Sequence, residues 1–357
     1  MKKLRLFPLI IFALFTAYLI TSCSKDDNND NTGAYTNGCF IANEGNFGNA
    51  NAEVSFYSYS SDSIANGIFK KVNNRELGDV LNSMAIYKNK IYMILNNSHK
   101  VEIATIDDFK QAGTIMEVKS PRYIGFFDNN AYITLWGDDP TDTGYLAIAD
   151  LETLKVTKTI KTGIGPEGVL VKDNKIWVAN GGGYTVDSTV TVFSVSDNSL
   201  VKTIVVGYCP KNFVVDKDNM IWVLCVGASD YADGSNDKPS SFAIINPTDY
   251  SVKKITIGKN DHPMQIGISK DKKTIFYGAG YSFSGIYKIA YNAQDFSKTK
   301  LIEGFFYGFS VNPNNDEIYT FDAKDYKSAG SMVRYKSDGT KIKEYTTGLI
   351  PSMAVFQ

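Results

Sequence analysis

The chain has 357 residues, and its 37 basic and 38 acidic side chains leave a formal net charge of −1 at pH 7. This balance gives no electrostatic reason to expect binding to nucleic acid or to an anionic membrane surface. The sequence is 43% hydrophobic with 22 Tyr and 21 Phe, which is ample for a core, but its two His and four Cys are too few to suggest a Cys/His zinc site.

The N-terminus has the pattern of an export signal. Three of residues 2–5 are basic, residues 6–20 are apolar, and small residues precede Cys23. The apolar run is shorter than the roughly 20 residues of a membrane span, so an uncleaved transmembrane anchor is the weaker alternative. Residues 1–22 resemble a bacterial lipoprotein signal peptide, in which Cys23 becomes the lipidated first residue.

Residues 23–37 are rich in Asp and Asn and cannot form a core, so they are expected to be a flexible tether. Lys25-Asp26-Asp27, close behind Cys23, resembles the acidic signal that sends lipoproteins of the Bacteroidetes to the outside of the outer membrane. The resemblance implies a protein that is lipid-anchored in the outer membrane and exposed at the cell surface.

From residue 38 onward the sequence repeats a unit of four short apolar runs. The clearest copy has runs at 168–171, 175–180, 189–195 and 200–206, rich in β-branched and aromatic residues and separated in part by polar turns of hairpin length. Four strands in about 40–50 residues is the pattern of a β-propeller blade. Six comparable copies start, at intervals of 39 to 53 residues, near Asn82, Pro121, Pro166, Pro210, Pro263 and Phe306.

The two ends of the sequence supply a seventh blade. Residues 350–356 match the first strand of a blade, whereas residues 39–43 match a second strand with no first strand before them. Further strands are expected at 52–59 and 68–72. The C-terminal strand should therefore complete the N-terminal blade and close the ring, which leaves no long open sheet edge. The predicted fold is all-β, a seven-bladed β-propeller over residues 38–357; an open β-solenoid or a two-sheet sandwich would not explain the split blade.

The geometry of a propeller restricts where a binding site can lie. The segment before each first strand and the loop between the second and third strands share one face, and the unusual sequence falls there. The positions that begin the first strands mix cations, an anion, amides, thioethers and aromatics, which favours a concave small-molecule site at the rim of the mouth over a structural plug. The candidate ligand-binding residues are Arg122, Tyr123, Trp136, Glu167, Asn180, Lys211, Asn212, Met264, Gln265, Tyr281 and Tyr307.

No motif in the sequence indicates catalysis. Two Gly-rich loops, at 45–48 and 181–183, have no helix after them that would hold a phosphate. No Ser, His and acid cluster recurs in the setting of a nucleophile. The loop at 227–240 is acidic but lacks the EF-hand spacing. We therefore expect no enzymatic activity, no cofactor and no metal, with a propeller enzyme of the lactonase or lyase type as the alternative.

The cysteines after the tether fall in expected strands. Cys209 begins the first strand of its blade and Cys225 ends the second, so the two lie roughly opposite each other. In an exported protein this pair either forms a disulfide or stays reduced as two small apolar residues. Cys39 is expected in the core.

Several stretches resemble known propellers. The segments GPEGV (165–169), KIWVAN (175–180) and SLVKTIVVG (199–207) are similar to YVTN-type seven-bladed propellers, and the likeness extends over the whole region from residue 38. The segments NEGNFG (43–48) and EVSFY (53–57) resemble the opening of Bacteroidetes surface lipoproteins with this fold.

The best-known members of that lipoprotein group bind cobalamin and pass it to a TonB-dependent outer-membrane transporter, so the resemblance implies the same ligand class and partner here. Arg122 and Lys211 would pair with the phosphate of a corrinoid. The aromatic candidates Tyr123, Trp136, Tyr281 and Tyr307 would pack on its ring edges. A ferric siderophore, a glycan or a protein partner remains an alternative, because blade repeats do not determine the ligand.

Overall fold

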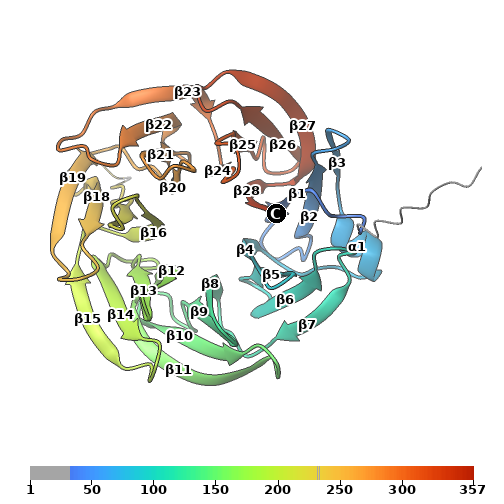
Figure 1. Ribbon diagram of the computed structural model, residues 1–357, viewed down its shortest axis with the longest axis horizontal. Coiled ribbons are helices and arrows are strands. Elements are labelled where there is room, and N and C mark those ends of the chain that lie inside the picture. Colours follow the sequence, from blue (N-terminus) through green and yellow to red (C-terminus); the bar gives the residue numbers. More distant parts are fainter. Residues whose placement is uncertain (1–32, 231, 233) are drawn as a thin grey trace, which may run out of the picture. The chain divides into compact units, whose positions relative to one another are not determined.

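The computed structural model describes residues 33–230, 232 and 234–357. In these residues 28 strands form seven four-stranded antiparallel sheets, which surround a central axis as the blades of a ring (Figure 1). The all-β, seven-bladed propeller predicted from the repeats is confirmed. The expected signal peptide, the lipidation site Cys23 and most of the tether lie outside the described residues.

Strand order within each blade runs outward from the axis. Blade 1 contains β4 (Leu81–Tyr87), β5 (Lys90–Leu95), β6 (Lys100–Thr105) and β7 (Gln111–Ile115). Blade 2 contains β8 (Pro121–Phe127), β9 (Asn130–Leu135), β10 (Thr143–Asp150) and β11 (Lys155–Ile164). Blade 3 contains β12 (Pro166–Lys172), β13 (Lys175–Asn180), β14 (Thr189–Ser194) and β15 (Leu200–Val205).

The remaining blades follow the same plan. Blade 4 contains β16 (Pro210–Val215), β17 (Ile221–Cys225), β18 (Ser240–Ile245) and β19 (Val252–Gly258). Blade 5 contains β20 (Gln265–Ile268), β21 (Thr274–Gly278), β22 (Ser284–Ala290) and β23 (Thr299–Phe305). Blade 6 contains β24 (Gly308–Val311), β25 (Ile318–Asp322), β26 (Ala329–Tyr335) and β27 (Lys341–Leu349). Blade 7 contains β28 (Pro351–Phe356), β1 (Gly38–Asn43), β2 (Glu53–Ser58) and β3 (Ser63–Ala65).

Blade 7 closes the ring as the split repeat predicts. Its innermost strand β28 pairs antiparallel with β1, so that Ile41 lies opposite Ala354. The two ends of the propeller therefore meet within one sheet (Figure 1). This closure leaves the first and last blades with neighbours on both sides.

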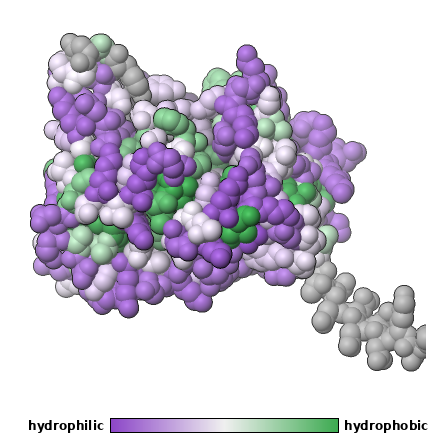
Figure 2. Space-filling view, turned by 90° about the horizontal axis from the view of Figure 1, so that it is seen from above, coloured by the Kyte–Doolittle hydropathy of each residue, from purple (hydrophilic) through white to green (hydrophobic). Residues whose placement is uncertain are grey.

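The core lies between the blades. In blade 3 the second strand β13 is almost wholly buried, whereas the outermost strand β15 is mostly exposed. Trp177 of β13 is fully buried in a cluster with Val223 and Ala243 of blade 4. Burying a large apolar side chain contributes roughly 1.5–3 kcal/mol, so each blade depends on its neighbour for much of its stability. The side view in Figure 2 shows largely hydrophilic loops projecting from one face of this packed body.

Residues 68–72 correct one expectation. They were expected to form the outermost strand of blade 7, but they belong to the helix α1 (Ile68–Asn73), and the strand is β3. Gly67 precedes the helix in a left-handed conformation (φ 66°), and the Glu53 carboxylate accepts two N–H groups of its first turn at 2.8 and 3.2 Å. The apolar residues at 68, 69 and 72 then share one helix face against the core.

Cys39, Cys209 and Cys225 are buried free thiols in the structure. Cys209 and Cys225 are therefore present as a reduced pair and not as a disulfide. The strand register places Pro210 opposite Cys225. Burial raises the pKa of Cys209 to about 11 and that of Cys225 to about 12. No helix within the described residues is both long and apolar enough to cross a membrane.

Candidate functional site

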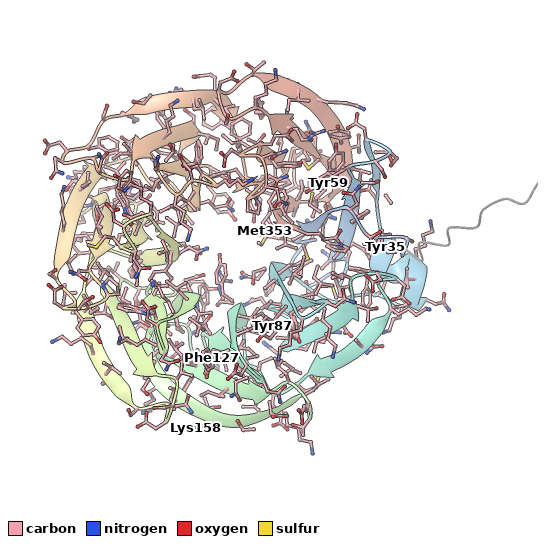
Figure 3. The ribbon with its side chains drawn as sticks, viewed as in Figure 1. Tyr35, Tyr59, Tyr87, Phe127, Lys158 and Met353 are labelled. Carbon is pink, nitrogen blue, oxygen red and sulfur yellow. The ribbon has the colours of Figure 1, made fainter. Side chains whose placement is uncertain are left out.

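A cavity of about 710 Å³ opens on the axis of the ring; we call it the axial cavity. Its lining comes from the segments that begin the innermost strands and from the loops between second and third strands, on the face where the sequence predicts a site. Met353, labelled in Figure 3, extends from β28 toward this central space. Because segments from all seven blades converge there, the rigid blades fix the cavity wall.

One side of the axial cavity holds three charged residues from equivalent positions of blades 2, 3 and 4. Arg122, Glu167 and Lys211 each follow the proline that begins β8, β12 and β16. The Glu167 carboxylate accepts Arg122 Nη2 at 3.0 Å and Lys211 Nζ at 3.1 Å. Exposed side-chain fractions are 14% for Arg122, 5% for Glu167 and 18% for Lys211. One enclosed carboxylate thus holds two cations together.

Burial and ion pairing shift the pKa values of Glu167 and Lys211 in opposite directions. Burial disfavours the charged form of Glu167, but Arg122 and Lys211 outweigh it and lower the pKa of the carboxyl. Burial also lowers the pKa of Lys211, and the attraction of Glu167 offsets that only in part. Within the triad two cations are paired with one carboxylate, although Glu44 in the same cavity lining also attracts Arg122 and Lys211.

Aromatic rings extend this side toward the solvent. The Arg122 guanidinium lies 4.2 Å from the ring centre of Trp136, in the loop between β9 and β10. Trp136 meets Tyr184, in the loop between β13 and β14, edge to face at 5.6 Å, and the Tyr184 side chain is 78% exposed. We call Arg122, Trp136, Glu167, Tyr184 and Lys211 together the cationic wall.

The other side of the axis carries phenols around a carboxyl, and we call Glu44, Tyr281 and Tyr307 the tyrosine wall. Tyr307 donates a hydrogen bond to Glu44 Oε2 at 2.7 Å, and the Tyr281 and Tyr307 hydroxyls lie 3.2 Å apart. Desolvation raises the pKa of Glu44 above its usual range, although the hydrogen bond from Tyr307 opposes the shift. The two walls therefore perturb their carboxyl groups in opposite directions.

The structure brings nine of the eleven predicted residues together in the axial cavity lining. Asn180 and Asn212 do not line it. Asn180 is fully buried, and its amide donates to the hydroxyls of Thr189 and Thr191 at 2.9 and 2.7 Å, which ties β13 to β14. The Asn212 side-chain oxygen accepts the N–H of the next residue at 2.8 Å. Both side-chain amides therefore form hydrogen bonds within their own blades.

Two more predictions need refinement. Gln265 lines the cavity, but its amide is occupied, accepting the Phe309 N–H at 2.6 Å and donating to the Ser352 carbonyl at 3.4 Å. Arg122, Glu167 and Lys211 were expected at a rim, whereas they are largely enclosed. Glu44 and Tyr184 lie in loops that the sequence marks as unusual, but neither was among the eleven candidates.

Family membership follows from the sequence of the propeller. A family model described as a domain of unknown function, DUF5074, matches residues 37–357. The chain belongs to the DUF5074 family. No curated protein matches the sequence. The expected likeness to cobalamin-binding lipoproteins stays a prediction.

Several solved structures share the fold of this DUF5074 protein. A quinonprotein alcohol dehydrogenase-like protein from Bacteroides thetaiotaomicron is similar at 15% identity and a TM-score of 0.66, over 90% of this chain and 78% of that one. A putative 6-phosphogluconolactonase from Bacteroides uniformis is similar at 10% identity and a TM-score of 0.64, over 90% and 100%. A functionally unknown protein from Desulfotomaculum acetoxidans is similar at 12% identity and a TM-score of 0.67, over 90% and 98%. Such low identities show the fold alone.

The axial cavity of this DUF5074 protein combines charged and aromatic side chains. Among the described residues, no three His, Cys, Asp or Glu side chains gather as metal ligands. His262 lines the axial cavity, but its ring nitrogens lie 2.8 Å from the Val226 carbonyl and 3.1 Å from Asp237. A positive, aromatic wall that faces phenols across an open cavity suits a large ligand with an anionic group.

Proposed function

We propose that the protein is a non-enzymatic capture protein whose axial cavity binds a bulky nutrient molecule with an anionic group. The observation that carries this proposal is the enclosed Arg122–Glu167–Lys211 triad, in which two cations share one carboxylate. An anion beside the triad would pair with the cation that exceeds the single carboxylate of Glu167. The cavity volume of about 710 Å³ also lies within the usual range of about 300–1,000 Å³ for small-molecule sites.

A corrinoid is the first candidate ligand. It combines a phosphate, which suits the cationic wall, with a broad ring that aromatic side chains can cover. We expect such a large molecule to enter the cavity only in part and to lie against Tyr184 and Tyr281, whose side chains are 78% and 69% exposed. The resemblance to surface lipoproteins supports this choice. On the same basis we propose that the protein is anchored through Cys23 at the cell surface and delivers its ligand to a TonB-dependent transporter.

Direct binding tests the proposal. Purified residues 33–357 are mixed with cobalamin, a ferric catecholate and a panel of glycans, and fluorescence quenching and co-elution of colour are measured. Trp136 lies in the cavity lining, so a bound corrinoid should quench its emission and co-migrate with the protein. Binding of a siderophore or a glycan in place of cobalamin would keep the capture function and change the ligand. Absence of binding by every compound would argue against a small-molecule site.

One observation favours a second candidate, hydrolysis of a phosphorylated sugar lactone. Glu44 combines a raised pKa with a hydrogen bond from Tyr307 inside the cavity, which is a setting that suits a general acid. Two similar structures are described as putative 6-phosphogluconolactonases. Proton release from 6-phosphogluconolactone is followed in a pH-stat with the unaltered protein and with Glu44→Gln. Turnover that is lost in Glu44→Gln would favour the enzyme over the capture protein.

A further inference from the structure

A second cavity, of about 680 Å³, lies between blade 6 and blade 7 on the face opposite the axial cavity. We call it the seam cavity, because it lies where the two ends of the propeller meet. Asn314 and Asn315 reach it from the turn between β24 and β25, and Asp62 reaches it from the turn between β2 and β3. Tyr59, labelled in Figure 3 beside these strands, contributes an aromatic ring.

The charged groups beneath the seam cavity neutralise one another. Arg334 Nη2 lies 2.7 Å from Glu317, and Arg334 Nη1 lies 3.2 Å from Asp62. The other oxygen of Asp62 accepts Lys343 Nζ at 2.6 Å. Two cations and two carboxylates therefore balance, and the guanidinium, with an exposed side-chain fraction of 15%, has no surplus charge for an anionic ligand.

The amide groups around the seam cavity, in contrast, keep unused hydrogen-bonding capacity. Within the described residues the side chain of Asn37 makes no hydrogen bond. Asn315 uses only its amide oxygen, which accepts the Glu317 N–H, and Asn314 uses only its amide nitrogen, which donates to the Gln357 carbonyl. The Tyr59 hydroxyl accepts a long bond of 3.4 Å from Asn312 and keeps its proton to donate.

We propose that the seam cavity is a second ligand site, which binds an uncharged polyhydroxylated molecule such as a neutral sugar unit. Amides and a phenol can both donate to and accept from hydroxyl groups, and a sugar presents a hydroxyl at nearly every ring carbon. The Tyr59 ring offers apolar surface for the C–H face of the sugar. An anionic sugar is disfavoured because Arg334 is already paired with Glu317 and Asp62, which leaves no cation for it.

Saturation-transfer NMR on residues 33–357 tests this site with neutral methyl glycosides and disaccharides, and with glucose 6-phosphate as the anionic comparison. We expect transfer to at least one neutral sugar that depends on Asn37 and Asn315, whereas any transfer to glucose 6-phosphate, as a ligand of the cationic wall, should be unaffected by Asn37→Ala and Asn315→Ala. Asn37→Ala and Asn315→Ala alter exposed side chains and should each weaken that sugar by about threefold to tenfold, the effect of losing one hydrogen bond. Leu200→Ala, at an exposed position of the outer strand β15, should not change the affinity.

Three outcomes would overturn the proposal. The first is the absence of transfer to every neutral sugar, and the second is transfer to glucose 6-phosphate that either Asn variant weakens. The third is binding that survives both Asn variants but is lost in Tyr184→Ala, which would place the sugar in the axial cavity. The result is independent of the proposed capture function, because the seam cavity shares no lining residue with the axial cavity.

Discussion

Arg122 and Arg334 occupy similar surroundings on opposite faces of the ring. Arg122 pairs with Glu167 and lies over Trp136, and Arg334 pairs with Glu317 and lies over Tyr57. Each arginine is largely enclosed. The difference lies in the balance of charge. In the axial triad two cations share the one carboxylate of Glu167, whereas at the seam two carboxylates face two cations.

This difference separates a recognition site from a structural junction. An arginine that is paired with two carboxylates stabilises the packing of two blades and offers little attraction to an anionic ligand. An arginine that shares its only carboxylate with a lysine retains attraction for an incoming anion. Substitutions at the seam should therefore reduce stability more than binding, and substitutions at the axial cavity should do the reverse.

The largest expected effect comes from breaking the seam itself. Deleting residues 349–357 removes β28, which pairs with β1, and also Gln357, which lines the seam cavity. Blade 7 would lose its innermost strand and expose the core around Ile41 and Tyr319. We expect aggregation, or a much lower melting temperature by circular dichroism. A soluble truncated protein with the melting temperature of residues 33–357 would contradict the closure of the ring through β28.

The next largest effect compares the two arginines directly. Arg334→Ala leaves Glu317 without its guanidinium partner and should lower the free energy of unfolding by about 3 kcal/mol, since the loss of one partner leaves a poorly solvated charge. Arg122→Ala should cost less, about 1–2 kcal/mol, because Lys211 still pairs with Glu167. Urea denaturation measures both values. Equal losses would mean that Lys211 does not stabilise Glu167 as the geometry implies.

Ligand affinity provides the reverse readout for the same two variants. Arg122→Ala should weaken a bound anionic ligand at least tenfold, whereas Arg334→Ala should leave its dissociation constant unchanged wherever the variant is folded. If Arg334→Ala weakened the ligand as strongly as Arg122→Ala, the two faces would not be independent.

The sequence predicted the scaffold well because blade repeats are local patterns. Alternating apolar runs and polar turns placed β13 at the observed residues and the other strands of blade 3 within two residues. The failure at residues 68–72 has a nonlocal cause. Glu53, which lies 16 residues before Phe69 in another element, accepts two N–H groups of the first turn of α1, and no run of apolar residues reveals that contact.

The site was predicted less completely for a related reason. Ring geometry brought Arg122, Glu167 and Lys211 to one face, but their mutual ion pairing depends on side-chain directions. Asn180 has the position of a site residue, yet its amide turns into the blade to satisfy buried threonines. Glu44 was missed because most candidates were taken from the starts of the first strands, whereas Glu44 lies in the loop directly after the second strand β1.

A moderate effect is expected from the exposed aromatic residues of the two walls. Tyr184→Ala and Tyr281→Ala remove rings that are 78% and 69% exposed, so the folded protein loses little packing. Each should weaken a large bound ligand by about tenfold, which is a common cost of removing an aromatic contact. Isothermal titration measures the affinity, with Leu200→Ala as a matched exposed control on β15. A ligand that tolerated both tyrosine variants would bind elsewhere than between the two walls.

The smallest expected effect is a pH dependence of stability that separates Glu44 from Glu167. Burial raises the pKa of Glu44 in the folded protein, so the folded state holds this proton more tightly than the unfolded chain. Its contribution to stability is present at low pH and is lost as the pH rises through the folded pKa. Arg122 and Lys211 lower the pKa of Glu167 against the opposing effect of burial, so its contribution is present above the unfolded pKa and is lost as the pH falls.

Glu44→Gln keeps a similar shape but cannot ionise. Urea denaturation from pH 4.5 upward should therefore show the variant losing less stability than the unaltered protein as the pH rises. Glu303→Gln, which removes a carboxylate that is 78% exposed, controls for the change in net charge. Parallel curves for the Glu44→Gln and Glu303→Gln proteins would mean that Glu44 is ionised as readily in the tyrosine wall as in water.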